Sequence, residues 1–254
     1  MKRLSFAVFG AAAVPLLLLG FQNCSKVGVS DIAAPQVAAA TGNPANLGAP
    51  TAPSAATPPV VCDPLSSGGT TCDASLGGAG LLGNVYFLLN GVGVQNYINN
   101  GQKLDVTVLL TDLDVPDRDW TAGFPGANGT PLTEPDGSIL NEWFAFDLNG
   151  KLQLPSSMSE GAYQFGFYSD DGAILYIDGQ MIVNNDGTHS AQWKCGALVN
   201  LKHNEQHQIR VLYYQGPRYH IALQMFMRPA SEQSQPCDNA AGGLQIVPAA
   251  ALSH

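Results

Sequence analysis

Short runs in which apolar and polar residues alternate recur along most of the chain. In the clearest run, Tyr163, Phe165 and Phe167 point to one side and the residues between them to the other. A period of two is typical of a β-strand with one buried face. Such runs predict strands at 85–89, 103–110, 143–147, 151–154, 162–168, 173–177, 181–183, 197–201, 207–214 and 219–227.

The spacing of these strands predicts an all-β protein, an antiparallel β-sandwich or barrel of about ten strands. Helical signals are almost absent, and the 28 glycines and 17 prolines concentrate in the turns and in the N-terminal part. We expect the core to include the alternating apolar residues of the last two predicted strands, which are Ile209, Val211 and Tyr213, and Tyr219, Ile221, Leu223, Met225 and Met227.

The N-terminus predicts an export signal at residues 1–24. A basic start, Met1-Lys-Arg3, precedes an apolar run at 4–20 that is short for a membrane span. Cys24 follows directly, as in a bacterial lipoprotein processing site, at which the cysteine is lipidated and becomes the new N-terminus. Ordinary cleavage is the alternative, because Asn23 stands where such sites usually have a small residue. We expect a lipid on Cys24 to anchor the exported protein to the bacterial outer membrane or cell surface.

The rest of the chain divides by composition. Residues 25–60 are rich in Ala, Pro, Gly and Thr, with almost no aromatic or charged residues, and predict a disordered linker, because this composition cannot bury enough surface to offset chain entropy. We expect a disulfide-containing lead-in at 61–84, a single β-sandwich at 85–229 and a C-terminal tail at 230–254.

Five cysteines fit an oxidising compartment. If Cys24 carries a lipid, then Cys62, Cys72, Cys195 and Cys237 remain as an even set. Three pairings are possible, and we favour Cys62–Cys72 together with Cys195–Cys237. No C-x-x-C spacing indicates zinc binding or redox catalysis.

The excess of acidic over basic residues limits the kinds of molecule that the protein is expected to bind. The formal net charge is -9, the pI is about 4.7, and charged residues make up only 12% of the chain. We therefore do not expect sequence-independent binding to nucleic acid. Clustered carboxylates in an exported protein are typical of a solvated surface or of ligands for divalent cations.

The most informative of these carboxylates are adjacent. Asp170 and Asp171 precede Gly172 between the predicted strands 162–168 and 173–177, so we expect them at the tip of a hairpin. Asp-Asp-Gly is a common turn sequence, in which the Asp side chain accepts hydrogen bonds from backbone N–H groups and Gly allows a positive φ. The same pair also offers hard oxygen ligands of the kind that calcium prefers. The residues alone leave both interpretations open.

Several motifs resemble one family. Ser169-Asp-Asp-Gly172, Leu175-Tyr-Ile-Asp-Gly179, Gly187-Thr-His189 and His207-Gln-Ile-Arg-Val-Leu-Tyr-Tyr214 are similar to the protective-antigen-type domain usually called PA-fourteen. The resemblance covers about 85–229. It implies a β-sandwich, and in the lectin members of the family two aspartates joined by a cis peptide hold a calcium ion that contacts sugar hydroxyls.

This resemblance implies a set of site residues. Asp170 and Asp171 would bind calcium, and the partner would be a glycan or glycoconjugate. In the lectin members a second loop completes the ion site with an asparagine, where this chain has Gln215. Gln215 would replace it as an oxygen donor, or the site would be degraded. Arg218 and Asn185 would add hydrogen bonds to the sugar.

Two further groups are weaker candidates. The segment 112–119 carries alternate carboxylates, but it lacks the pattern of a helix-loop-helix calcium loop, and Arg118 can neutralise its neighbours. We expect a structural or solvated role for it. Tyr214, Tyr219 and Trp193 would serve as sugar platforms only beside the aspartate pair, because alternating aromatic residues are usually core.

The sequence predicts a binding protein rather than an enzyme. No nucleophile elbow, phosphate loop or Cys/His couple is visible. Glycosidase carboxylates face each other across a cleft, whereas Asp170 and Asp171 are neighbours in sequence. The function we expect is an envelope-anchored, adhesin-like carbohydrate-binding protein with a calcium-assisted site. The alternative is a non-catalytic structural or protein-interaction module without metal.

Overall fold

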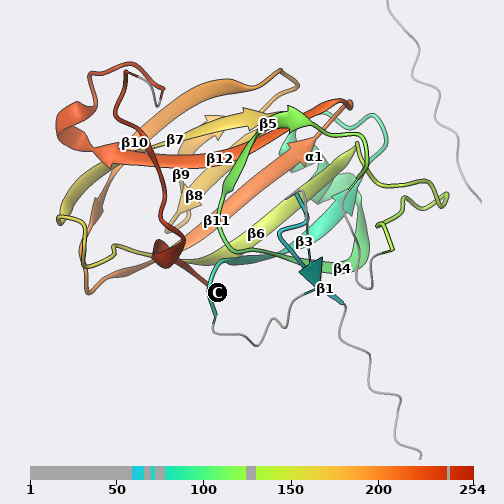
Figure 1. The fold of residues 1–254 in the computed structure, drawn as a ribbon, viewed down its shortest axis with the longest axis horizontal. Coiled ribbons are helices and arrows are strands. Elements are labelled where there is room, and N and C mark those ends of the chain that lie inside the picture. Colours follow the sequence, from blue (N-terminus) through green and yellow to red (C-terminus); the bar gives the residue numbers. More distant parts are fainter. Residues whose placement is uncertain (1–58, 66–69, 72–77, 124–129, 239–240) are drawn as a thin grey trace, which may run out of the picture. The chain divides into compact units, whose positions relative to one another are not determined.

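Two β-sheets contain most of the residues that the structure describes. The computed structural model describes residues 59–65, 70, 71, 78–123, 130–238 and 241–254 (Figure 1). The larger sheet contains β1 (Val60–Cys62), β2 (Thr70–Thr71), β3 (Leu81–Phe87), β4 (Gln102–Leu110), β6 (Phe144–Gln153), β8 (Ala173–Ile177), β9 (Gln180–Asn185), β11 (Gln206–Gln215) and β14 (Leu252–Ser253). The smaller contains β5 (Asp114–Asp119), β7 (Gly161–Asp170), β10 (Gln192–Leu201), β12 (His220–Pro229) and β13 (Gln245–Ile246).

The strand order confirms the predicted all-β sandwich. The larger sheet runs β2-β1-β4-β3-β6-β11-β8-β9, with β14 beside β6, and the smaller runs β10-β7-β12-β13, with β5 beside β12. Every pair is antiparallel except β1 with β4. Among the described residues, three short helices accompany the sheets: α1 (Val94–Asn100), η2 (Ala230–Glu232) and η3 (Ala249–Ala251). No helix in the described residues is both long and apolar enough to span a bilayer.

The core lies between the two sheets and is aromatic. Phe144 and Phe146 of β6 are fully buried together with Phe165 and Phe167 of β7. The predicted alternating faces of β11 and β12 also join this core. Tyr219 is the exception: it lies just before β12 and is 67% exposed. Burying aromatic side chains of this size is the main source of stability in such a sandwich.

Several predicted elements differ from the observed ones. Residues 143–147 and 151–154, predicted as two strands, belong mostly to the single strand β6, which continues through Asn149-Gly150. The acidic segment 112–119 contributes β5, which pairs with β12. Helix α1 was not predicted. Its buried residues, Val94 and Tyr97, form a second small core on the outer side of the larger sheet.

The predicted hairpin at Asp170-Asp171 is wrong. Strands β7 and β8 belong to different sheets, so the residues between them cross from one layer of the sandwich to the other. β7 instead pairs with β10 and β12, and β8 pairs with β9 and β11. The alternating pattern identifies both strands but does not reveal which sheet each one joins.

The sandwich is larger than the predicted interval 85–229. The lead-in provides β1 and β2, and the C-terminal residues provide β13 and β14, of which β14 pairs with β6. The predicted signal at 1–24, including Cys24, and all but the last two residues of the predicted linker lie outside the described residues.

One predicted disulfide is confirmed. Cys195 of β10 is bonded to Cys237, which ties the segment after β12 to the smaller sheet. Cys62 of β1 is also disulfide-bonded. Cys72, its predicted partner, lies outside the described residues.

Candidate functional site

Three connections between the sheets meet at one end of the sandwich. Residues 171–172 join β7 to β8, residues 186–191 join β9 to β10, and residues 216–219 join β11 to β12. The register places them together, because Ser169 pairs with Gln192 and Asp170 pairs with Ala222. Strand β5 ends here too, where Asp119 pairs with His220. Segments distant in sequence therefore surround Asp170 and Asp171.

Asp171 connects all three crossings. One carboxylate oxygen accepts the backbone N–H of His189 at 2.9 Å, and the other accepts that of Gly216 at 2.7 Å. The side chain is only 3% exposed. Burial raises the pKa of Asp171, and these two hydrogen bonds act in the opposite direction by favouring the ionised form. The crossings thus hold this carboxylate in a fixed orientation.

Asp170 is the second carboxylate of the pair. It is 8% exposed, and its peptide bond to Asp171 is cis, as the family resemblance implies. The hydroxyl of Tyr213 donates a 2.6 Å hydrogen bond to its backbone carbonyl. Burial raises the pKa of Asp170 to about 6, with further contributions from the charges of Asp171 and Asp117. Ionising both aspartates is therefore costly without a nearby positive charge.

Neither carboxylate forms an ion pair with a described lysine, arginine or histidine. The pair opens instead on a pocket of about 490 Å³. One wall carries Asp170, Asp171 and the 188–191 segment, and the other carries residues 217–220 and Asp117. The site is thus an anionic pocket rather than a turn facing bulk solvent.

Gly172 is required by the close approach of its neighbours. A Cβ atom at this position would lie 2.7 Å from a carboxylate oxygen of Asp186 and would overlap the ring of Tyr214. That ring is buried and stacks on Tyr97 of α1, with centroids 5.3 Å apart. The glycine therefore allows the crossing at 171–172 to pass close beneath α1.

Gln215 does not reach the pocket. Its side chain is fully buried, and its Oε1 accepts the Tyr213 hydroxyl at 2.8 Å. Its Nε2 donates to the carbonyls of Pro217 at 3.1 Å and His220 at 2.9 Å. Both ends of the amide are thus engaged in folding the 216–219 crossing. We therefore assign Gln215 to shaping this loop, not to contacting an ion or a sugar.

Asn185 also lies behind the site. It is 4% exposed, and its amide donates to the Ser169 hydroxyl at 2.8 Å and to the carbonyl of Gln192. Its backbone carbonyl contacts a ring nitrogen of His189 at 3.0 Å. These bonds fasten the 186–191 crossing to β7 and β10. The predicted sugar contact from this side chain has no basis in this geometry.

Arg218, in contrast, lines the pocket as predicted. Its guanidinium contacts the carboxylate of Glu142, and its backbone N–H donates to the same carboxylate at 3.0 Å. The bond to Arg218 lowers the pKa of Glu142. The charge of Arg218 is therefore balanced by Glu142, and this ion pair holds the 216–219 crossing in place.

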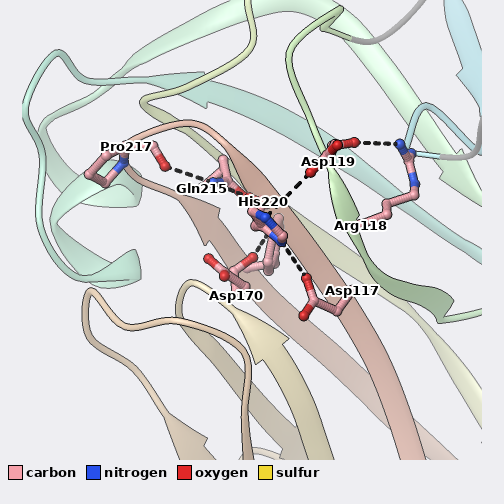
Figure 2. Close-up of polar contacts among 8 residues, drawn as sticks. Asp117, Arg118, Asp119, Asp170, Gln215, Pro217 and His220 are labelled. Carbon is pink, nitrogen blue, oxygen red and sulfur yellow. Dashed lines mark hydrogen bonds and ion pairs between the residues drawn. The ribbon is translucent and has the colours of Figure 1, made fainter.

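The wall formed by β5 was not predicted. His220 at the start of β12 contacts Asp117 at 2.8 Å through Nδ1 and Asp119 at 3.4 Å through Nε2. Figure 2 shows His220 between Asp170 on one side and Asp117 and Asp119 on the other. The bond to Asp117 raises the pKa of His220. Alternate carboxylates at 112–119 are visible in the sequence, but their pairing with β12 is not.

Of the three aromatic candidates, Tyr219 alone lines the pocket beside the aspartates. Tyr214 is buried beneath α1, where its hydroxyl contacts that of Thr188 at 2.8 Å. Trp193 packs against Tyr168 and Phe226 on the outer side of the smaller sheet. Tyr219 thus lies beside the aspartate pair, where an aromatic platform for a sugar was expected.

The chemistry of Asp170 and Asp171 fits a hard divalent cation. Two buried carboxylates with raised pKa values and no described ion-pair partner would be relieved by a positive charge between them. The described residues contain no group of three or more His, Cys, Asp or Glu side chains that could hold a metal. Calcium takes six to eight oxygens, so the other ligands would be backbone carbonyls, water and a bound molecule.

Most of the site lies in a region that matches a known domain family. Residues 132–239 match the model of the PA14 domain, the protective-antigen-type domain that the motifs resemble. The match includes Asp170, Asp171 and the three crossings and leaves out β3, β4 and β5. No curated protein matches the chain.

Solved structures show weaker likenesses. An anti-sigma factor domain-containing protein aligns at 20% identity and a TM-score of 0.46, over 69% of this chain and 47% of its own. A PA14 sugar-binding domain from an RTX adhesin aligns at 20% identity and 0.49, over 69% and 98%. The A domain of epithelial adhesin 6 from Candida glabrata, in complex with Galβ1-3GlcNAc, aligns at 14% and 0.39, over 78% and 97%. The chain spans about half the length of the first of these proteins.

Proposed function

We propose that this protein is a carbohydrate-binding, adhesin-like protein of the bacterial envelope, and that a calcium ion at Asp170 and Asp171 assists binding. The observation that carries the proposal is the pair of buried carboxylates, which have no described ion-pair partner and open on a pocket within the PA14 domain. A solvated turn would not need its carboxylates buried. A cation site does need buried carboxylates, because exclusion of water strengthens the attraction between the ion and the carboxylates.

Asp170 and Asp171 would hold the ion. Bound calcium would exchange water ligands for two hydroxyls of a sugar. The backbone amides of His189 and Gly216 keep the Asp171 carboxylate in one orientation, and Tyr213 fixes the backbone of Asp170. This preorganisation lowers the entropy cost of binding a weakly held ligand.

The loop around the ion would complete sugar recognition. Arg218 lines the pocket and has N–H donors beyond those that contact Glu142, and these donors would bind sugar hydroxyls. Tyr219 offers an exposed aromatic surface beside the carboxylates, suited to the apolar face of a sugar ring. Gln215 stabilises this loop by donating hydrogen bonds to the carbonyls of Pro217 and His220. Each contact is small, so we expect weak affinity at one site and stronger attachment through many copies.

The proposed envelope location rests on the N-terminal sequence. A lipid on Cys24 would hold the domain at the membrane, and residues 25–60 would give it reach. A C24S variant should lose incorporation of labelled fatty acid and leave the membrane fraction. Equal labelling of C24S and wild type would contradict the lipid anchor and would leave the proposed sugar binding unaffected.

A glycan array tests the binding function. The wild-type protein in calcium should bind at least one glycan, and a calcium chelator should remove that binding. D170N and D171N, which keep side-chain shape but remove one charge each, should bind at least about tenfold more weakly, equivalent to 1.4 kcal/mol. D105N is the matched control, because Asp105 is an exposed carboxylate on β4 of the other sheet.

Two results would contradict the calcium-assisted site, and the second would favour the metal-free structural module. One is binding that survives both the chelator and the D170N change. The other is a folded protein that binds no glycan and whose melting temperature does not respond to calcium, since a ligand at 100 times its dissociation constant should add about 2.7 kcal/mol of stability.

A further inference from the structure

The pocket beside Asp170 and Asp171 is bordered by more negative charge than a divalent cation can neutralise. We propose that it accepts uncharged saccharides and rejects those carrying a carboxylate or sulfate, and that Asp117 is the residue that determines this choice. The inference rests on the proposed function, and it names the class of saccharide that the same site takes.

The charged side chains around the pocket determine which saccharides would be rejected. Asp117, Asp170 and Asp171 line it, and Asp119 lies on the same edge of β5, within 3.4 Å of His220. A divalent cation would balance two of the four carboxylates. The charge of Arg218 is already balanced by Glu142. Two carboxylate charges would therefore remain beside the bound ion.

Asp117 is the carboxylate left facing a ligand. Asp170 and Asp171 would be engaged by the ion, and the side chain of Asp119 is 90% exposed and absent from the pocket lining. The Asp117 side chain is 37% exposed, and His220 holds it in place through a 2.8 Å contact. Asp117 can therefore accept a hydrogen bond from a sugar hydroxyl, whereas an anionic substituent at the same place would be repelled.

The position of Asp117 is set by the fold. Strand β5 pairs with β12 through Asp119 with His220 and Arg118 with Ile221. Arg118 is turned away from the pocket, since it contacts the carbonyl of Leu65 and its guanidinium stacks over the Trp120 ring at 5.1 Å. The neighbouring arginine therefore does not pair with Asp117, whose contact at the pocket is His220.

Matched sugar pairs test the inference. The mature full-length protein, with excess calcium at pH 8, is titrated with methyl galactoside and methyl galacturonoside, and with the corresponding glucose and mannose pairs. Each pair keeps the ring hydroxyls and differs by a carboxylate at carbon 6. D117N removes the charge with little change in shape, and D105N is the control on the remote strand β4.

We expect wild type and D105N to prefer the uncharged member of a bound pair by about tenfold or more, which corresponds to 1.4 kcal/mol. D117N should reduce that ratio to about threefold or less. Raising the salt concentration should also reduce the wild-type ratio, because screening weakens repulsion between partly exposed charges.

Equal binding of both members by wild type would overturn the inference, and so would an unchanged ratio in a folded D117N protein. Either result would leave calcium-dependent sugar binding intact. Failure to bind any member of any pair, combined with an empty glycan array, would overturn the proposed function and this inference together.

Discussion

At the scale of single residues, the site depends on which polar side chains are satisfied within the protein and which are not. Gln215 and Asn185 have their amides fully engaged in the fold, whereas Asp170 and Asp171 are buried without a described ion-pair partner. The same residue types could not be separated in this way from the sequence, because the partner of one of these side chains lies up to 45 residues away, as Gly216 does from Asp171. Burial and partners, rather than residue type, identify the ligand candidates.

Gly172→Ala tests the crossing beside the aspartates. The added methyl group would meet the buried ring of Tyr214, which stacks on Tyr97, and the carboxylate of Asp186, which accepts hydrogen bonds from the backbone N–H groups of Val94 and Gly187. Overpacking of this kind costs about 1–3 kcal/mol of unfolding free energy, measurable by urea denaturation. The variant should also lose calcium-dependent stabilisation, since the crossing carries Asp171. A variant as stable and as calcium-responsive as wild type would contradict this packing.

At the scale of elements, strands were easier to predict than their partners. Period-two alternation located the inner faces of β7, β11 and β12, because one side of each strand is buried. It did not reveal that β7 and β8 lie in different sheets, since a crossing and a hairpin use the same Asp-Gly turn residues. Helix α1 was missed because its seven residues include three asparagines and only a short apolar pattern.

The β8–β9 turn gives a pH-dependent prediction. Asp178 accepts the backbone N–H of Gln208 at 2.8 Å and contacts His207 at 2.7 Å. The bond to His207 lowers the pKa of Asp178. A carboxylate with a lowered pKa in the folded state stabilises the protein above its unfolded pKa of about 3.9. That stability is lost as pH falls through the folded pKa.

D178N should therefore be less stable than wild type at pH 6, by about 0.5–1 kcal/mol because the group is partly exposed. The difference should disappear in strong acid. Asparagine tolerates the positive φ of this position, so the turn itself is kept. Urea denaturation at several pH values measures the effect, with D105N as control. A deficit that is constant at all pH values would point to lost packing instead.

At the scale of the whole molecule, the sandwich is closed by segments beyond the predicted domain. Arg228, 2% exposed, donates to Gln164 on β7 and to backbone carbonyls of the segment 233–242. The disulfide Cys195–Cys237 fastens the same segment to β10. The cysteine spacing indicated this bond, but the role of Arg228 could not be predicted, because it depends on where an irregular segment folds back.

Replacing both Cys195 and Cys237 by alanine should lower the unfolding free energy. The bond joins residues separated by 42 positions, and closing a loop of that size is worth about 3–4 kcal/mol in the chain-entropy account. Denaturation of the double variant measures the loss while leaving the disulfide at Cys62 intact. Calcium-dependent sugar binding should persist, because Cys195 pairs with Gly166 in the middle of β7 and Cys237 follows β12, whereas Asp170 ends β7 and pairs near the start of β12. Loss of sugar binding in a folded double variant would contradict that separation.

The central claim is that Asp170 and Asp171 hold a cation that sugar hydroxyls can reach. Crystals grown with millimolar calcium, measured at a wavelength where calcium scatters anomalously, test it most directly. We predict an anomalous peak at about 2.3–2.6 Å from carboxylate oxygens of both residues, and, after soaking in a bound glycan, two sugar hydroxyls on the same ion. No peak beside the two carboxylates, in crystals that contain calcium, would contradict the account.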